Sequence, residues 1–187
     1  MTPQAAEAAL FDDVLMHEDR RAAAFLPDGP DAAPTHDCVA RAEMLLVALA
    51  HSENVRGAED KDDLAETSSA LQRVEAKVDL LLGLFGRLMR ERGHLPQPTL
   101  LRWSPRGARV SMQGDAIAVR PGTAGVLRVQ PAEWLPDCID LPARVIATDG
   151  REAWLEFGPL SPALSDALER HLFRLHRRQV AESRRLR

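Results

Sequence analysis

The sequence of 187 residues has only two cysteines, Cys38 and Cys138, and they form no CxxC pair. Its N-terminus lacks the basic and apolar regions of a secretory signal peptide. No apolar run approaches the roughly 18 residues that a membrane-spanning helix needs. These absences predict a cytoplasmic protein with two reduced thiols and no membrane insertion.

The sequence also has no excess of positive charge, since its formal net charge is −4 at pH 7. That balance argues against a general nucleic-acid binder. Among the basic residues, 22 are arginine and 2 are lysine, which we interpret as a compositional bias of the source genome and not as a functional signal.

Motifs for metal binding and nucleophilic catalysis are missing as well. The six histidines show no metal-ligand spacing, and neither cysteine lies near a second sulfur in the sequence. Ser104 could be drawn into a triad with a histidine and an aspartate, but no nucleophile elbow surrounds it. We therefore predict no metal site and no enzymatic activity.

The most regular pattern present is a seven-residue repeat of apolar residues between residues 60 and 92. An acidic run at residues 59–63 begins this stretch and arginines close it, followed by Gly93, as expected for a helix of these bounds. A strict heptad spacing is typical of a coiled coil. The predicted seam consists of Leu64, Leu71, Val78 and Phe85 at the a positions and Thr67, Val74, Leu81 and Leu88 at the d positions.

The apolar stripe of this helix is too wide for a simple two-stranded coil. Leu82 and Met89 occupy e positions and Leu84 a g position, where a parallel dimer normally carries charges. We therefore expect a homo-oligomer with more than two helices in the bundle, a tetramer first. The alternative is that the wide stripe packs on the chain's own domain.

The rest of the chain predicts an α+β fold with three regions. Residues 1–36 form an N-terminal strand arm and loop, with a charged turn at residues 17–21. Residues 37–93 form an inserted helical pair, in which a helix at 37–53 precedes a break at 54–57 and the coiled coil at 60–92. Residues 94–187 form a small antiparallel barrel and a C-terminal helix. The period-two strands are predicted at 100–103, 108–112, 116–120, 126–130, 143–148 and 153–157.

The C-terminal helix is predicted from about residue 161 to residue 185. Ser161 and Pro162 suit its N-cap and first turn. Its buried stripe is predicted to consist of Leu164, Leu168, Leu172 and Leu175.

This order of elements, with the segment 103–107 (WSPRG) between two strands, resembles the PilZ family. The runs 77–82 (KVDLLL) and 173–178 (FRLHRR) are similar to the atypical, tetramer-forming PilZ proteins, in which long helices are inserted and one carries a heptad repeat. The resemblance covers about residues 10–178. It implies a PilZ-like barrel in cyclic di-GMP signalling, with links to motility, type IV pili and virulence.

Ordinary PilZ domains bind cyclic di-GMP through an RxxxR motif and a [D/N]xSxxG motif. Here Ser104 and Gly107 match the second motif, but Arg102 stands at its acidic or amide position. In the first motif, Arg20 or Arg21 supplies one arginine, while Ala24 and Phe25 stand four residues further on. The resemblance thus implies a possible remnant of a ligand site at Arg20, Arg21, Arg102, Ser104, Arg106 and Gly107, and without its partner residues the serine and glycine are better explained as a plain turn.

We therefore predict an oligomeric signalling adaptor without a cofactor, which contacts protein partners in a signalling or pilus pathway and does not bind cyclic di-GMP in the usual mode. One alternative is a true receptor that binds cyclic di-GMP through substitute arginines. A less favoured alternative is nucleic-acid binding by the C-terminal arginines, which include Arg170, Arg174, Arg177 and Arg178. No aromatic residues suited to base stacking interleave with that cluster.

Overall fold

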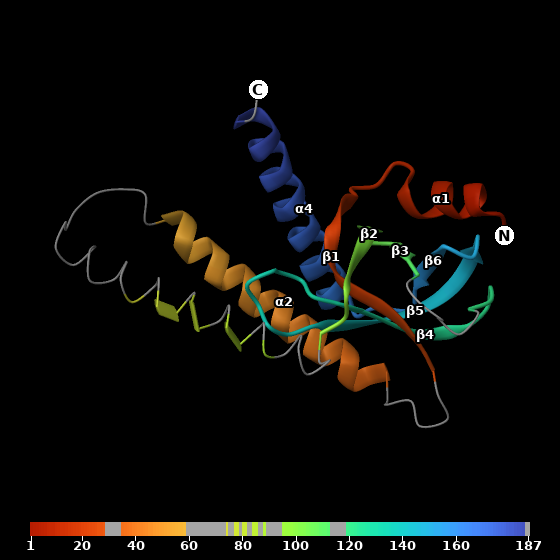
Figure 1. Cartoon of the computed structure of the whole chain (residues 1–187), viewed down its shortest axis with the longest axis horizontal. Coiled ribbons are helices and arrows are strands. Elements are labelled where there is room, and N and C mark those ends of the chain that lie inside the picture. Colours follow the sequence, from red (N-terminus) through yellow and green to blue (C-terminus); the bar gives the residue numbers. More distant parts are fainter. Residues whose placement is uncertain are drawn as a thin grey trace.

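The computed structural model describes residues 1–28, 35–58, 95–112 and 119–185, together with eight single positions between residues 74 and 88. The elements in chain order are α1 (Pro3–Phe11), β1 (His17–Pro27), α2 (Thr35–Ala58), β2 (Pro98–Ser104), β3 (Gly107–Ser111), β4 (Ala124–Val129), β5 (Ile139–Thr148), β6 (Glu152–Phe157) and α4 (Pro162–Arg185). Figure 1 shows the barrel with α2 and α4 gathered on one side and α1 on another. None of the helices within the described residues is both long and apolar enough to cross a membrane.

Six antiparallel strands close into a barrel in the order β1-β2-β3-β6-β5-β4. Strand β1 closes it because its first half pairs with β2 and its second half pairs with β4. Buried residues alternate with exposed or half-buried residues along β2 and with half-buried residues along β4, so that about one side chain in two points into the barrel. The predicted small antiparallel barrel is confirmed.

The barrel interior forms one apolar core with residues of α2 and α4. Trp103 is its largest fully buried side chain. Of the predicted stripe on α4, Leu164, Leu168 and Leu172 are fully buried, and Leu175 packs partly buried against the core. Ser161 caps α4, since its Oγ accepts a hydrogen bond from the Leu164 backbone N–H at 3.1 Å.

Helix α2 lies against β5 and α4. Ala42 and Leu46 join the core, and Glu43 accepts a hydrogen bond from the Ser161 hydroxyl at 2.8 Å. The predicted break at residues 54–57 is wrong, because α2 runs without interruption to Ala58. A single glycine near a helix end costs only about 1 kcal/mol, which the surrounding helix outweighs.

The N-terminal region differs from its prediction in two respects. Residues 10 and 11 end helix α1 and do not form a strand, since Thr2 caps a helix through its side chain and Pro3 occupies the first turn. The predicted charged turn at residues 17–21 is the first half of β1. Its charged side chains are compatible with a strand because they form ion pairs, as for Glu18 with Arg102.

Two strand predictions also change. Strand β5 begins at Ile139 and not at residue 143, because Pro142 is accommodated within the strand opposite Val126. Of the predicted strand at residues 116–120, positions 116–118 lie outside the described residues, while Val119 and Arg120 are not in a strand.

Candidate functional site

The turn between β2 and β3 holds the end of helix α1. Ser104 is fully buried, and its Oγ donates a hydrogen bond to the Leu10 carbonyl at 2.7 Å and accepts one from the Arg106 backbone N–H at 3.1 Å. The Arg106 guanidinium donates to the carbonyls of Ala9 and Asp12 at 3.2 and 3.1 Å. Both side chains therefore anchor the N-terminal segment.

Gly107 is required at this turn by space. A Cβ atom added there would lie 2.1 Å from the Leu155 carbonyl oxygen and 2.8 Å from the Leu10 side chain. The close approach of β3 to β6, with α1 on top, thus leaves no room for a side chain. The glycine of the WSPRG segment serves packing in this chain.

Arg102 lies on the outer face of the barrel between two carboxylates. Its Nε donates to Glu18 and one terminal nitrogen donates to Glu7 of α1, both at 2.5 Å. Partial burial lowers the pKa of the guanidinium, but the hydrogen bonds and charges of Glu18 and Glu7 outweigh it and raise the pKa further. Arg102 is therefore a permanently charged partner of α1.

Arg109 stands opposite Arg102 across the β2–β3 hairpin. It lies 3.3 Å from Glu7, 3.5 Å from Glu18 and 3.6 Å from Glu152. The sequence offered no sign of the three carboxylates, because Glu7, Glu18 and Glu152 belong to α1, β1 and β6. The strand register of the hairpin was the one available signal for pairing the two arginines.

Arg20 and Arg21 lie on opposite faces of β1. Arg20 is exposed on the outer face, whereas Arg21 is 7% exposed. The Arg21 guanidinium binds the Asp19 carboxylate, donates to the carbonyls of Gln130 and Pro131 at 3.3 and 2.9 Å, and lies 5.0 Å from the centre of the Trp103 ring.

The contacts of Arg21 lower the pKa of its neighbour Asp19. Burial alone would raise the pKa of Asp19, but the hydrogen bonds from Arg21 and His17 outweigh it and lower the pKa to about 2.

Of the six predicted remnant residues, Arg102, Ser104, Arg106 and Gly107 come together at the β2–β3 turn against α1. Arg20 lies apart on the outer face of β1, and Arg21 is built into the protein interior.

His171 lies on the buried face of α4, in edge contact with the Trp103 ring at 5.7 Å between centroids. Burial, reinforced by the nearby charges of Arg21 and Arg174, lowers the pKa of this histidine to about 3. The imidazole is therefore neutral at neutral pH.

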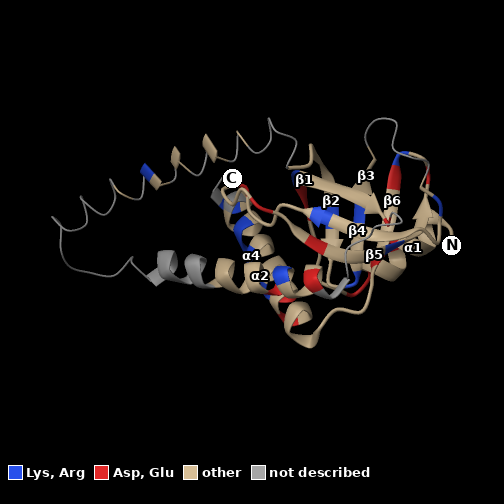
Figure 2. Ribbon diagram, turned by 90° about the horizontal axis from the view of Figure 1, so that it is seen from below, with Lys and Arg blue, Asp and Glu red and all other residues tan. Residues whose placement is uncertain are grey.

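In contrast to His171, Arg170, Arg177 and Arg178 of the same helix are exposed. Figure 2 shows the basic residues along α4 and charges of both signs on the barrel.

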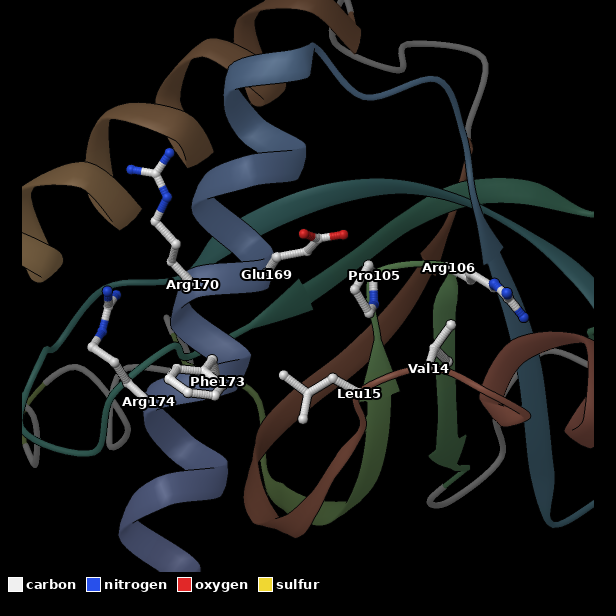
Figure 3. Close-up of a pocket in the computed structure, with 8 residues that line it drawn as sticks. All are labelled: Val14, Leu15, Pro105, Arg106, Glu169, Arg170, Phe173 and Arg174. Carbon is white, nitrogen blue, oxygen red and sulfur yellow. The ribbon is translucent and has the colours of Figure 1, made fainter.

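A groove of about 810 Å³ separates α4 from the β2–β3 turn and the segment that leads into β1 (Figure 3). Phe173 and Leu15 face each other across it, and Phe173 is 52% exposed. The arginines at its rim, Arg170 and Arg174, point away from these apolar side chains in the same view. The groove is lined by Val14, Leu15, Pro105, Arg106, Glu169, Arg170, Phe173 and Arg174.

Five of the eight predicted seam residues are described, and all five are helical and exposed. Their exposed fractions run from 40% for Leu88 to 64% for Leu81, and neighbouring Leu84 is 56% exposed. The other two a residues and one d residue of the seam, Leu64, Leu71 and Thr67, lie outside the described residues. The described part of the chain therefore leaves the apolar side chains of Val74, Val78, Leu81, Phe85 and Leu88 uncovered.

The two cysteines are free thiols, and burial raises the pKa of Cys138 to about 11. In the described part of the chain, no three side chains of histidine, cysteine, aspartate or glutamate come together as metal ligands. The described site therefore consists of ion pairs, carbonyl contacts and an apolar groove, with Arg102, Ser104, Arg106 and Gly107 at its centre.

A closed barrel of this strand order with an inserted helix and a C-terminal helix defines the PilZ class of signalling domains, and the comparisons with known proteins agree. The family model "Atypical PilZ domain, cyclic di-GMP receptor" matches residues 46–185. A solved structure of a pathogenic protein from Xanthomonas campestris, described as a new tetrameric PilZ domain self-assembled via an unusual helical bundle, is 42% identical, with a TM-score of 0.71 over 96% of this chain and 97% of that chain. No curated protein matches the chain. The chain belongs to the atypical PilZ domain family.

Proposed function

We propose that this protein is a non-catalytic, oligomeric adaptor in cyclic di-GMP related regulation of motility, type IV pili or virulence. Its assembly is a tetramer held by the predicted coiled coil of residues 60–92. The observation that carries this proposal is the row of exposed apolar side chains on that helix, Val74, Val78, Leu81, Leu84, Phe85 and Leu88. An apolar row of this kind needs a covering partner, and the relative from Xanthomonas campestris supports a helical bundle of four copies.

The contacts of the motif residues support an adaptor without the usual nucleotide-binding mode. Ser104 and Arg106 donate hydrogen bonds to main-chain carbonyls of α1, and Arg102 forms ion pairs with two carboxylates. Arg21 is buried against main-chain carbonyls. A ligand phosphate would have to displace these contacts before it could reach a guanidinium.

The groove between α4 and the β2–β3 turn supports a protein-binding surface on the barrel. The half-exposed Phe173 ring faces Leu15 there, and aromatic side chains in such positions are frequent anchors of protein interfaces. In a tetramer, each barrel would offer one copy of this groove to its partner.

The oligomer is tested by light scattering on wild type and on a Val78→Asp, Leu81→Asp double variant. We expect the wild type to have the mass of four chains. We expect the double variant to have the mass of one chain while unfolding cooperatively, because an unpaired carboxylate buried in a packed seam costs more than the roughly 2–7 kcal/mol of a buried neutral polar group without a hydrogen bond.

The matched control for this experiment is Leu80→Asp. Leu80 is 63% exposed, close to the 64% of Leu81, but it occupies a c position outside the seam. The control should keep the wild-type mass. A double variant that remains a tetramer would contradict the proposal and show that the seam is not the assembly surface.

A second candidate function is a true cyclic di-GMP receptor that uses Arg20, Arg21, Arg102 and Arg106 in place of the usual motif. The description of the matching family as a cyclic di-GMP receptor favours it. Calorimetric titration of cyclic di-GMP into the wild-type tetramer separates the two functions. Saturable binding of cyclic di-GMP would establish the receptor function. The absence of binding heat would leave the adaptor function as the better proposal.

A further inference from the structure

The exposed face of α4 carries a regular stripe of arginines and apolar residues. Arg170, Arg177 and Arg184 follow one another at intervals of seven residues, and Phe173 and Val180 have the same interval. Positions seven residues apart lie on one face of a helix, and all five side chains are exposed. We call these five residues the α4 stripe.

The two apolar members of the α4 stripe lie outside the core. Phe173 is 52% exposed and Val180 is 37% exposed, whereas Leu168 and Leu172 on the other face of the helix are fully buried. In the described part of the chain, neither Phe173 nor Val180 packs against the barrel core. Apolar side chains that recur on an exposed helix face are typical of a surface that another helix covers.

The groove between α4 and the β2–β3 turn adjoins the α4 stripe, because Phe173 belongs to both. Its ring faces Leu15 across the groove, and Val14 and Pro105 add to the apolar lining (Figure 3). A volume of about 810 Å³ lies in the range that accommodates a drug-sized molecule. The groove can therefore accept more than one side chain of a bound segment.

The charge of α4 differs from that of the whole chain. The chain has a formal net charge of −4, but α4 contains six arginines and three acidic residues. Arg170 lies 3.7 Å from Asp166 in an exposed pair, which contributes little to stability and leaves the guanidinium accessible to a second carboxylate. The Arg177 guanidinium lies 5.9 Å from the centre of the Phe173 ring. Charge complementarity therefore favours an acidic segment whose carboxylates lie next to an apolar side chain.

An acidic protein segment fits this face better than a nucleic acid or an anionic membrane does. Arg170 and Arg174 point away from the apolar walls of the groove, so a phosphate backbone would contact the arginines without using Phe173 or Leu15. The negative net charge of the chain also opposes the approach of a large polyanion. Two exposed apolar residues are too few to anchor a helix in a membrane interface.

We propose that the α4 stripe and the groove bind an amphipathic helix of a partner protein. Its apolar residues lie seven residues apart and enter the groove between Phe173 and Leu15, and its neighbouring acidic residues pair with Arg170 and Arg177. The alternating intervals of three and four residues along the α4 stripe suit side-by-side packing of two helices over about four turns. This inference rests on the proposed adaptor function, and it states which kind of segment the adaptor recognises.

The test is a selection from a displayed library of roughly 18-residue helical peptides with the full-length protein as the target. Synthetic peptides of the enriched sequences are then titrated into wild type, Phe173→Ala and Arg177→Glu, with binding measured by fluorescence anisotropy. The matched controls are Leu100→Ala, which truncates a 40% exposed leucine of β2, and Arg151→Glu, which reverses an exposed arginine before β6. Neither control residue lines the groove.

We expect the enriched peptides to combine leucine or phenylalanine at intervals of seven residues with neighbouring glutamate or aspartate. Phe173→Ala and Arg177→Glu should each weaken peptide binding at least about tenfold, whereas each control should change it by less than about twofold. A peptide with lysine in place of its acidic residues should bind Arg177→Glu more tightly than it binds wild type, because the charges are then complementary again.

The proposal is overturned if no helical peptide is enriched, if the enriched peptides are not acidic, or if Phe173→Ala binds them as tightly as Leu100→Ala does. It is also overturned if duplex DNA or anionic vesicles bind in a Phe173-dependent manner while the peptides do not. Light scattering on the same samples separates these outcomes from a failure of the adaptor proposal. A tetramer that selects no acidic peptide refutes the α4 site alone, whereas a monomer that selects one refutes the tetramer and leaves the site. A loss of the tetramer in Phe173→Ala would show that the α4 stripe is a contact between copies and would overturn the proposal.

Discussion

The buried His171 makes the stability of this protein sensitive to mild acid. Its pKa is about 3 in the folded chain, while an unfolded chain restores a value near 6.5. The unfolded state therefore binds the proton more readily, so the contribution of His171 to stability is fully present above pH 6.5 and is lost as the pH falls towards 3.

The size of this effect follows from the difference between the two pKa values. At pH 4.5, which is two units below 6.5, His171 is protonated in the unfolded chain but still neutral in the folded chain. Proton binding to the unfolded state therefore lowers the free energy of unfolding by roughly 2–3 kcal/mol between pH 7.5 and pH 4.5. The Asp19 carboxylate contributes in the same direction only below its ordinary value of 3.8, because its pKa in the folded chain is about 2. A comparison at pH 4.5 therefore isolates the histidine.

Urea unfolding of wild type and of His171→Leu, at one protein concentration and at both pH values, measures this contribution. Wild type should lose roughly 2–3 kcal/mol more than the variant on going to pH 4.5. The leucine keeps an apolar side chain against Trp103 and has no proton to gain. Equal losses in the two proteins would refute the assignment of the pH dependence to His171.

Two further predictions concern a glycine and a thiol. Gly107→Ala should lower the free energy of unfolding by at least about 2 kcal/mol, because the added Cβ would clash with the Leu155 carbonyl. The control Gly158→Ala should change it by less than about 1 kcal/mol, because the nearest atom to its added Cβ lies at 3.4 Å. Equal effects of the two substitutions in thermal melts would contradict the steric argument. In a Cys38→Ser background, alkylation of Cys138 by iodoacetamide should keep accelerating with pH beyond about pH 10, since burial raises its pKa from 9.0 to about 11. A rate that is half-maximal near pH 9 and levels off by about pH 10 would show an ordinary thiol.

The sequence predicted those parts of the fold whose signals are local. Period-two alternation identified most strands of the barrel, and the cap at Ser161 and the leucine spacing identified α4 and its buried face. Local signals failed where a distant partner decides the structure. The charges of residues 17–21 are typical of a turn, yet these residues pair with β2. Glu18 forms an ion pair with Arg102 across the sheet, and Asp19 forms one with Arg21 of the same strand.

The candidate site was less accessible to sequence reasoning for the same reason. The WSPRG segment led to Ser104 and Gly107, but nothing local indicated that both residues hold α1. Arg21 looked like a ligand-binding arginine because the sequence does not reveal burial. Glu7 and Arg109 were missed because their partners are about 100 residues distant in the chain.

The position of β1 in the barrel has a consequence for the order of folding. Its two neighbours, β2 and β4, begin at Pro98 and Ala124, so about 70 residues separate the end of β1 from its first partner. Closing a loop of that length is slow compared with forming a helix. During synthesis, β1 is thus an unpaired strand of eleven residues until the inserted segment has been made. The barrel can close only after the segment between β1 and β2 has left the ribosome, so the proposed oligomerisation seam is complete before the barrel that it carries.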